Sequence, residues 1–284
     1  MDGPYLLRLL RVMVRLARRP AAILDDLGRQ LAFYGGAVRE APRTMLSYRK
    51  ELLRLLSEVA FGTGALAVIG GTVVIVSFLT FFTGLEVAQE GYRSLDSLGV
   101  AVYTGFVSAY FNTREIAPIV SGLALTATVG AGFTAQLGAM RISEEIDALE
   151  VMGIPSIPYL VTTRLIAGLV AVIPLYVVGL VSSYISTRLI VTLYFHQSGG
   201  TYDHYFHTFL VPTDVFYSFV KIIIFAIVVM LIHCYYGYYA SGGPAGVGVA
   251  VGRAVRTSIV AINVIDLFLS LAIWGANVTV RIAG

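Results

Sequence analysis

Residues 222–252 read IIIFAIVVMLIHCYYGYYASGGPAGVGVAVG, a run that contains no Asp, Glu, Lys or Arg. A helix rises about 1.5 Å per residue, so roughly 20 apolar residues cross the hydrocarbon core of a bilayer. Backbone amides in lipid must be satisfied within their own segment, so such a run is expected to be a helix. Four further runs have the same character, with only Asp266 interrupting the last: 59–85, 116–140, 165–187 and 257–280. The sequence therefore predicts an all-α integral membrane protein with five transmembrane helices.

The composition of the whole chain agrees with this prediction. Of the 284 residues, 57% are hydrophobic and 13% are charged, and the mean hydropathy is +0.80. A soluble domain usually carries about 25% charged residues, so this chain has too little polar surface for a soluble fold. The shorter uncharged stretch 97–113 is expected not to span, because only Arg114 and Glu115 separate it from the next run. The expected spans are 62–82, 116–140, 159–187, 216–238 and 257–274.

The positive charges are concentrated before the first span. Of 20 Lys and Arg residues, 11 lie between Arg8 and Arg54, which makes this region cytoplasmic by the positive-inside rule and places the C-terminus, after five spans, in the periplasm. We expect two regions, a basic cytoplasmic and interfacial one over 1–58 and a membrane domain over 59–284. The first region contains arginines at helical spacing that predict an amphipathic helix on the membrane surface, ended by Pro20: Arg8, Arg11, Arg15, Arg18 and Arg19.

Span two carries a ladder of small side chains. They recur every four residues and so share one helix face, which allows close approach of another helix in lipid. The neighbour could be a helix of the same chain or of a second subunit. The ladder consists of Gly122, Thr126, Gly130, Thr134 and Gly138.

The loop after span two has the pattern of a short acidic amphipathic helix. Ser143 is expected to be its N-cap, with acidic residues in the first turn, and Gly153 and Pro155 are expected to end it. The pattern fits an ordinary solvated loop helix or a helix that docks on a cytoplasmic partner. The residues concerned are Glu144, Glu145, Asp147, Ala148, Leu149 and Glu150.

Several polar residues fall in or beside the expected spans. Arg114, Glu115 and Pro118 lie at the outer end of span two, where the two charges anchor the interface or line a cavity mouth. Asp266, with Asn263 one turn earlier, interrupts span five and is expected to face protein or water. An outer loop contains histidines at 196, 204 and 207, and its many aromatic residues favour an interfacial belt over a metal site.

Motifs for catalysis are missing from the sequence. No G-x-x-x-x-G-K-[ST] occurs, so the chain is not expected to hydrolyse ATP by that route, and no G-x-S-x-G or H-E-x-x-H occurs. The single cysteine, Cys234, excludes a disulfide framework. We expect no bound cofactor or metal, and the charge pattern does not favour nucleic acid as a partner.

Two segments resemble the MlaE/YrbE permeases. FTAQLGAMRISEEIDALEVM, at 133–152, resembles the signature of that family, and REIAP, at 114–118, resembles its R-E-L-G-P. The basic N-terminus and the phrase HCYYGYY, at 233–239, resemble the B-type YrbE subunit of actinobacterial (mycobacterial) Mce systems. Ala117, Thr128 and Gln136 depart from the family pattern, where many members have Gly, Arg and Glu.

The resemblance implies a five-span inner-membrane permease that pairs with an A-type YrbE subunit. It implies two copies of a cytoplasmic ABC ATPase that uses ATP and Mg²⁺, and a periplasmic Mce hexamer that conducts lipid. Residues 144–150 would then be the coupling helix that docks on the ATPase, and Glu115 would lie near the lipid cavity. The cargo would be a lipid such as a fatty acid, a mycolic acid or a sterol, moved by import.

Two other functions were weighed against the transporter. The chain could be a scaffold that anchors an Mce assembly without transporting lipid. It could also be an intramembrane enzyme that uses Asp266 or the outer histidines.

Overall fold

The computed structural model describes residues 25, 27–61 and 71–275, and all elements in this part of the chain are helical. Five helices among these residues are long and apolar enough to cross a membrane, which confirms the predicted fold class. The predicted amphipathic helix around Arg8–Arg19 lies outside the described residues. The five long helices are Gly71–Ser97, Ala101–Ile142, Ile157–Tyr194, Pro212–Tyr238 and Gly243–Trp274.

Two of the five long helices, the second and the third, combine several elements. The first, fourth and fifth are α4 (Gly71–Ser97), α11 (Pro212–Tyr238) and α12 (Gly243–Trp274). The second runs without interruption through η1 (Ala101–Tyr103), α5 (Thr104–Val107), η2 (Ser108–Ile116), α6 (Ala117–Leu125), η3 (Thr126–Gly130) and α7 (Ala131–Ile142). The third combines η4 (Ile157–Thr162), α9 (Thr163–Leu189) and η5 (Ile190–Tyr194). Except for the 3₁₀ turn η1, the η segments are π-helical.

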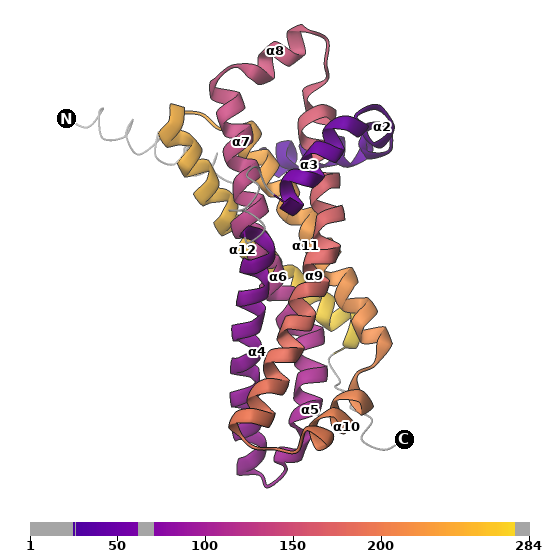
Figure 1. Ribbon diagram of the computed structural model, residues 1–284. Helices are drawn as coiled ribbons and strands as arrows, with labels where there is room; N and C mark the ends of the chain where they lie inside the picture. The colour runs from indigo at the N-terminus through magenta and orange to yellow at the C-terminus, as the bar shows by residue number, and fades with distance from the viewer. Residues whose placement is uncertain (1–24, 26, 62–70, 276–284) are drawn as a thin grey trace, which may run out of the picture.

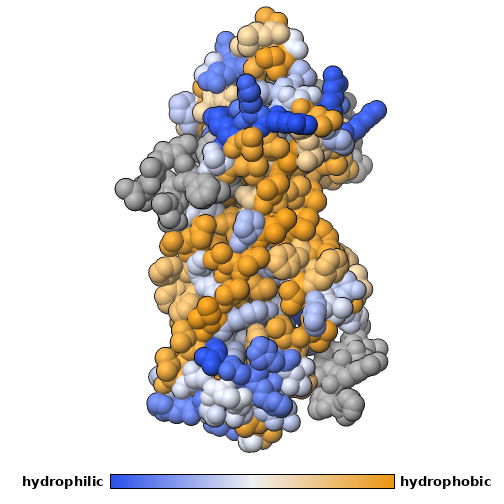
Figure 2. Space-filling model, turned by 45° about the vertical axis from the view of Figure 1, so that its right-hand side comes forward, coloured by the Kyte–Doolittle hydropathy of each residue, from blue (hydrophilic) through white to orange (hydrophobic). Residues whose placement is uncertain are grey.

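The molecule is an elongated bundle with two different ends (Figure 1). The short helix α8 (Glu145–Val151) lies at one end, called here the α8 end, together with α2 (Ala41–Ser47) and α3 (Arg49–Phe61). Helix α10 (Gly199–Phe209) lies at the opposite end, the α10 end. Figure 2 shows an apolar band around the middle of the bundle and hydrophilic side chains gathered toward both ends. This distribution is the one expected of a chain that spans a bilayer.

The structure corrects several predicted boundaries. Residues 101–116 do not form a separate non-spanning stretch but begin the second long helix, which has 42 residues and a length of about 63 Å. Charged residues that were expected in a connection, from Glu86 to Asp96, lie on α4. The glycine-rich segment expected as a loop starts α12, because Gly242 and Gly243 turn the chain at positive φ and the helix begins there. Arg253 and Arg256 are therefore helical.

The small-residue ladder of the second helix packs within the chain. A side chain at Gly122 would meet Phe225 and Ile262, and one at Gly130 would meet His233. The Thr134 hydroxyl lies 2.7 Å from His233 Nδ1, so a polar contact accompanies the close approach. The sequence left open whether the ladder packs against the same chain or a second subunit. The structure shows that it packs against α11 and α12 of the same chain.

The residues before the first span pack on the same core. Phe33, in a helix over 27–39, makes ring contacts with Tyr235 and Tyr238 at centroid distances of 5.5 Å. The carbonyl of Ala37 accepts a hydrogen bond of 3.0 Å from Thr162 in η4. Residues 27–61 therefore lie against the membrane bundle at the α8 end (Figure 1).

Helices α4 and α9 cross closely because α4 presents a narrow face. Its buried residues recur every four positions as Val76, Thr80, Gly84 and Ala88. Thr187 of α9 donates a 3.0 Å hydrogen bond to the carbonyl of Gly84, and Ser182 donates one of the same length to Ser77. In lipid, an apolar side chain gains little by contacting a helix instead of a lipid chain. Small residues and hydroxyl-to-backbone hydrogen bonds therefore usually stabilise helix pairs there.

We expect Gly84→Ala to destabilise the bundle, because the added methyl group would overlap Ser183 and Ser186 of α9. Overpacking of this kind costs about 1–3 kcal/mol. The matched control is Gly248→Ala in α12, where nothing lies within 4 Å of the added atom and helix propensity favours alanine by about 1 kcal/mol. Thermal unfolding in detergent should show a lower melting temperature for the first variant alone. Equal melting temperatures would contradict the close crossing.

Candidate functional site

A fully buried lysine lies at the centre of a polar cluster in the membrane part of the bundle. Lys221 of α11 has no exposed side-chain surface, and its Nζ lies 2.6 Å from Asp266 Oδ1 and 3.1 Å from Glu115 Oε2. Nζ also donates to the carbonyl of Arg114 at 2.7 Å and to Ser270 Oγ at 3.0 Å. Three separate segments, η2, α11 and α12, thus meet around one ammonium group.

A second ion pair extends this cluster. Arg114 donates through Nε and Nη2 to Asp214 Oδ2 at 2.9 and 2.6 Å, and Trp274 Nε1 donates to Asp214 Oδ1 at 2.8 Å. The Arg114 guanidinium carbon lies 4.0 Å from the Tyr110 ring centroid and 5.0 Å from that of Trp274. Aromatic faces stabilise a cation most strongly where water is excluded. We define the polar cluster as Arg114, Glu115, Asp214, Lys221, Asp266, Ser270 and Trp274.

The polar cluster forms one wall of a cavity of about 290 Å³. Glu115 and Arg114 both line the cavity, and their side chains are 31% and 16% exposed. The lining also includes the apolar residues Leu267, Leu271 and Ile273 of α12. With all groups ionised, the cluster has three carboxylates and two cations. Their hydrogen bonds and ion pairs offset the cost of placing these charges in a site of low polarity. The cavity can therefore hold a ligand with one polar and one apolar end.

The structure brings together some of the residues that the sequence singled out. Arg114, Glu115 and Asp266 belong to the polar cluster, and Pro118 is buried at the start of α6 beside it. Asn263 does not join them: it lies on the exposed face of α12, where its amide donates to the carbonyl of Ile259 at 2.8 Å. Asn263 and Asp266 are one helical turn apart but differ in burial, because Asn263 is exposed and Asp266 is buried.

The sequence reasoning missed Lys221, Asp214, Ser270 and Trp274 as members. Lys221 left a signal, because a lysine inside an otherwise apolar run needs a partner in the membrane. The uncharged run used to define span four began only after it, at Ile222. Asp214 lies before the predicted span 216–238, whereas the structure places it in the first turn of α11.

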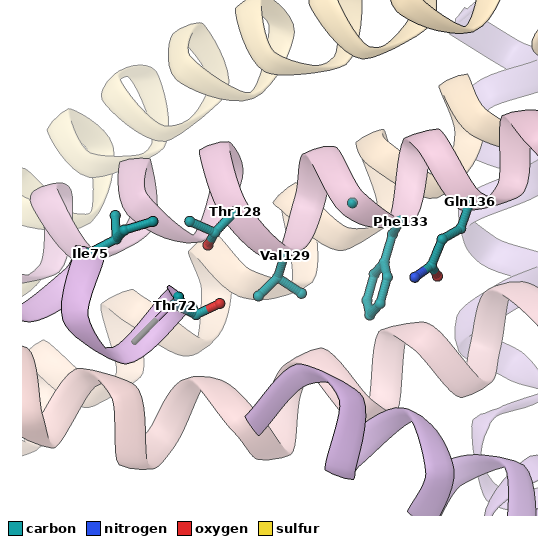
Figure 3. A pocket seen from close by; sticks show the side chains of 8 residues that line it. Thr72, Ile75, Thr128, Val129, Phe133 and Gln136 are labelled. Atoms are coloured by element: carbon teal, nitrogen blue, oxygen red, sulfur yellow. The ribbon is translucent and has the colours of Figure 1, made fainter. Parts of the chain in front are cut away.

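A smaller cavity of about 220 Å³ lies between α4 and the second long helix. Figure 3 shows Thr72 and Ile75 on α4 facing Thr128, Phe133 and Gln136. Thr128 and Gln136, which both depart from the family pattern, thus line the same cavity.

An arginine of the third helix reaches Gln136. Arg164 Nη2 lies 3.4 Å from Gln136 Oε1, and Nη1 donates to the carbonyl of Leu160 at 2.9 Å. Neutral acceptors therefore take part in holding a guanidinium that is almost completely buried.

Helix α8 lies at the tip of the α8 end and connects the second and third long helices (Figure 1). Glu144 turns the chain at φ 61° and precedes α8. The prediction that Ser143 caps this helix was wrong, because Ser143 ends α7 and its Oγ donates to Glu145 Oε1 at 2.7 Å. Glu144, in the left-handed backbone conformation, occupies the N-cap position of α8, so Ser143 lies one residue too early to serve as the cap.

The two faces of α8 differ as the sequence predicts. Ile146 is fully buried and Leu149 packs against the core. Glu145, Asp147 and Ala148 are exposed, and Arg141 Nη1 forms an ion pair with Asp147 Oδ1 at 2.7 Å. The tip that follows exposes two apolar residues, Val151 at 89% and Met152 at 66%.

Glu150 ties α8 to the bundle. Its Oε1 accepts hydrogen bonds from Ser156 at 2.6 Å and from the Tyr238 hydroxyl at 3.2 Å. Tyr238 is the last residue of α11, the same helix that carries Lys221. The hydrogen bond from Tyr238 therefore connects α8 to the helix that passes through the polar cluster.

The segment with histidines at 196, 204 and 207, predicted as an outer loop, contains the helix α10. Arg188 donates to Asp203 at 2.8 and 2.9 Å, and this guanidinium holds the pKa of the Asp203 carboxyl below its ordinary value. Tyr202 is buried against α5, where its carbonyl faces Gly105. Among the described residues, no group of three or more His, Cys, Asp or Glu could hold a metal ion.

Comparison with known proteins points to one family. The family model described as permease MlaE matches residues 61–272. A probable ABC transporter permease protein of Rickettsia bellii is 27% identical, over 92% of this chain and 97% of its own. A probable ABC transporter permease protein of Synechocystis is 30% identical, over 66% of this chain and 72% of its own. The chloroplastic protein trigalactosyldiacylglycerol 1 of Arabidopsis thaliana is 30% identical, over 66% and 54% of the two chains.

We expect Lys221→Met to destabilise the protein strongly, because it leaves the buried Asp266 and the partly buried Glu115 without their cation. Breaking a buried pair from one side costs about 3–5 kcal/mol. Adding Asp266→Asn should restore part of the loss, so the two substitutions should be far from additive in a thermal unfolding cycle.

The exposed pair Arg188 and Asp203 serves as the control for this cycle. Its side chains are 50% and 39% exposed, and exposed pairs contribute little to stability. Arg188→Gln and Asp203→Asn should therefore leave the melting temperature nearly unchanged. Additive effects at Lys221 and Asp266 would contradict the coupling of the polar cluster.

Proposed function

The chain belongs to the MlaE permease family, which makes it an ABC transporter permease, and we propose that it is the membrane subunit of an ATP-driven lipid importer of the Mce type. The observation that carries the proposal is the cavity of about 290 Å³ beside the polar cluster. Ligand sites combine an apolar lining with a few placed polar groups. A lipid has a polar headgroup and apolar chains, and this cavity offers partners for both.

The size of the cavity limits how a lipid would bind. A volume of about 290 Å³ is at the lower limit of ligand pockets, so it accommodates a headgroup and the first carbons only. The chains would then continue along the exposed apolar residues of α12, such as Leu267 and Phe268. Residue types do not choose between a fatty acid, a mycolic acid and a sterol, and each remains a candidate.

The charge distribution supports a cytoplasmic α8 end. The described basic residues before the first span, from Arg29 to Arg54, lie on helices at the same end of the bundle as α8 (Figure 1), and positive charge favours the cytoplasmic side. The α10 end, the polar cluster and the last residues of α12 would then lie toward the periplasm. This orientation presents the lipid cavity to a periplasmic Mce assembly and α8 to a cytoplasmic ATPase.

We further propose that α8 is the surface that receives a separate ATPase subunit. The chain has no phosphate-binding loop motif, so nucleotide chemistry would belong to another chain. Exposed apolar residues beside charged ones are typical of protein interfaces, and Val151 and Met152 directly follow the acidic residues of α8. The bonds of Glu150 to Ser156 and Tyr238 provide a route from this surface to α11.

The function is tested by purifying the assembly from native membranes through a tag on this chain. We expect mass spectrometry to find an ABC ATPase, a second YrbE-like chain, Mce proteins and a bound lipid. The ATPase activity of that assembly should rise when the lipid is added. An assembly whose ATPase ignores every lipid tested would favour the scaffold role, and recovery of this chain alone would oppose both.

The docking surface is tested by Val151→Asp. A carboxylate at the exposed tip should weaken association with the ATPase by about tenfold or more, since burying an unpaired charge at an interface is costly. Leu98→Asp is the matched control, because Leu98 is a similarly exposed apolar residue, at 75%, in the turn after α4. Co-purification of the ATPase should fall for the first variant and stay constant for the second. An equal effect of both would locate the contact elsewhere.

A further inference from the structure

A third cavity, a cleft, lies at the α8 end and shares no lining residue with the cavity beside the polar cluster. It has a volume of about 470 Å³ and separates the N-terminal helices from the start of the third long helix. One wall carries Arg39, Arg43 and Thr44, and the other carries Pro155, Ile157 and Pro158. The cleft is thus basic and hydroxylated on one side and apolar on the other.

The two arginines flank the junction between two helices. Arg39 ends the helix over 27–39 and Arg43 lies in α2, with Glu40 between the two helices, and both arginines line the cleft. Both are exposed, and neither forms an ion pair with any residue in the described part of the chain. Glu40 also lines the cleft, so the lining carries a net charge of +1 when all three groups are ionised.

Thr44 supplies a donor that the protein itself does not use. Only 1% of this residue is exposed, and its hydroxyl has no hydrogen-bond partner among the described residues. Other buried threonines, such as Thr80 and Thr126, donate to the carbonyl four residues earlier. A buried unsatisfied hydroxyl is rare enough to require an explanation, and a ligand oxygen in the cleft would provide one.

The cleft lies where the surface changes from charged to apolar. Val38, Met45 and Leu46, on the same helices as the arginines, are exposed by 48%, 51% and 69%. Ile157 on the far wall is the first residue of the third long helix. In Figure 2 the hydrophilic side chains near the α8 end stand directly above the apolar band. Helices with exposed apolar and basic residues at this level lie in the interface of the bilayer.

We propose that this cleft binds the phosphate of an anionic phospholipid as a resident lipid, separate from the transported one. Arg39 and Arg43 would donate to the phosphate oxygens, which guanidinium groups match in geometry, and the Thr44 hydroxyl would donate to a further oxygen. A phosphodiester of charge −1 neutralises the +1 lining, and a glycerol headgroup can donate its hydroxyls to Glu40. The acyl chains would leave along Ile157 and the proline wall. The proposal rests on membrane embedding and not on the direction or cargo of transport.

The test uses the complete purified assembly in detergent and native mass spectrometry. Phosphatidylglycerol and phosphatidylcholine with identical chains are titrated against the wild type, Arg39→Gln/Arg43→Gln and Thr44→Val. Each basic residue near a membrane contributes about 1 kcal/mol to the attraction of anionic lipid, so the double variant should bind phosphatidylglycerol roughly 10- to 30-fold more weakly. Thr44→Val should weaken binding by a smaller factor, and the preference for phosphatidylglycerol should disappear with the arginines.

The matched control is Arg49→Gln/Lys50→Gln, which removes the same charge from exposed residues that do not line the cleft. It should bind phosphatidylglycerol within about twofold of the wild type, since only charges in the cleft contact the phosphate. Equal weakening in both double variants would show diffuse surface attraction and overturn the site. Inorganic phosphate that binds in the cleft while neither lipid does would also overturn it. A melting temperature equal to wild type for each variant establishes that the folds are comparable.

Discussion

The ammonium group of Lys221 is the constraint on which the arrangement of the membrane helices depends. A charge enclosed among apolar helices must be paired and hydrogen-bonded, and no single helix can supply all the partners. Its partners here come from η2 and α12, so α11 is held between them. The π-helical segment η2 provides both a carboxylate and a backbone carbonyl from neighbouring residues, Glu115 and Arg114. Wider turns of this kind are frequent at functional sites in helices.

The remaining contacts in the membrane follow from the weakness of apolar packing in lipid. Lipid chains contact an apolar side chain as well as another helix does, so helix pairs rely on close backbone approach and on hydroxyl groups. The crossing of α4 with α9 uses both, through Gly84 and Thr187. The contact of α7 with α11 does the same, through Gly130, Thr134 and His233. These contacts make the polar cluster part of a rigid frame.

The two ends of the bundle differ in charge and in what they expose. The α10 end is closed by aromatic packing and by the Arg188–Asp203 pair. The α8 end exposes an apolar tip and carries the basic cleft. Glu150 and Tyr238 connect α8 to α11, the helix that also carries Lys221. The basic cleft and the cavity beside the polar cluster are lined by different residues and differ in chemistry.

The sequence by itself determined the helical class, the number of spans and the family, because long uncharged runs in lipid leave the backbone no alternative to helix. It also indicated Arg114, Glu115 and Asp266, since charges in apolar segments are rare. Only the tertiary structure decided that Lys221, Asp214 and Trp274 complete the polar cluster and that Asn263 stays outside it. Helix boundaries were also beyond the sequence, because the segments 86–116 and 243–256 mix charges and glycines with apolar residues. Which residues meet depends on helix rotation and crossing, and these are set by contacts between segments more than 100 residues apart, such as Arg114 and Lys221.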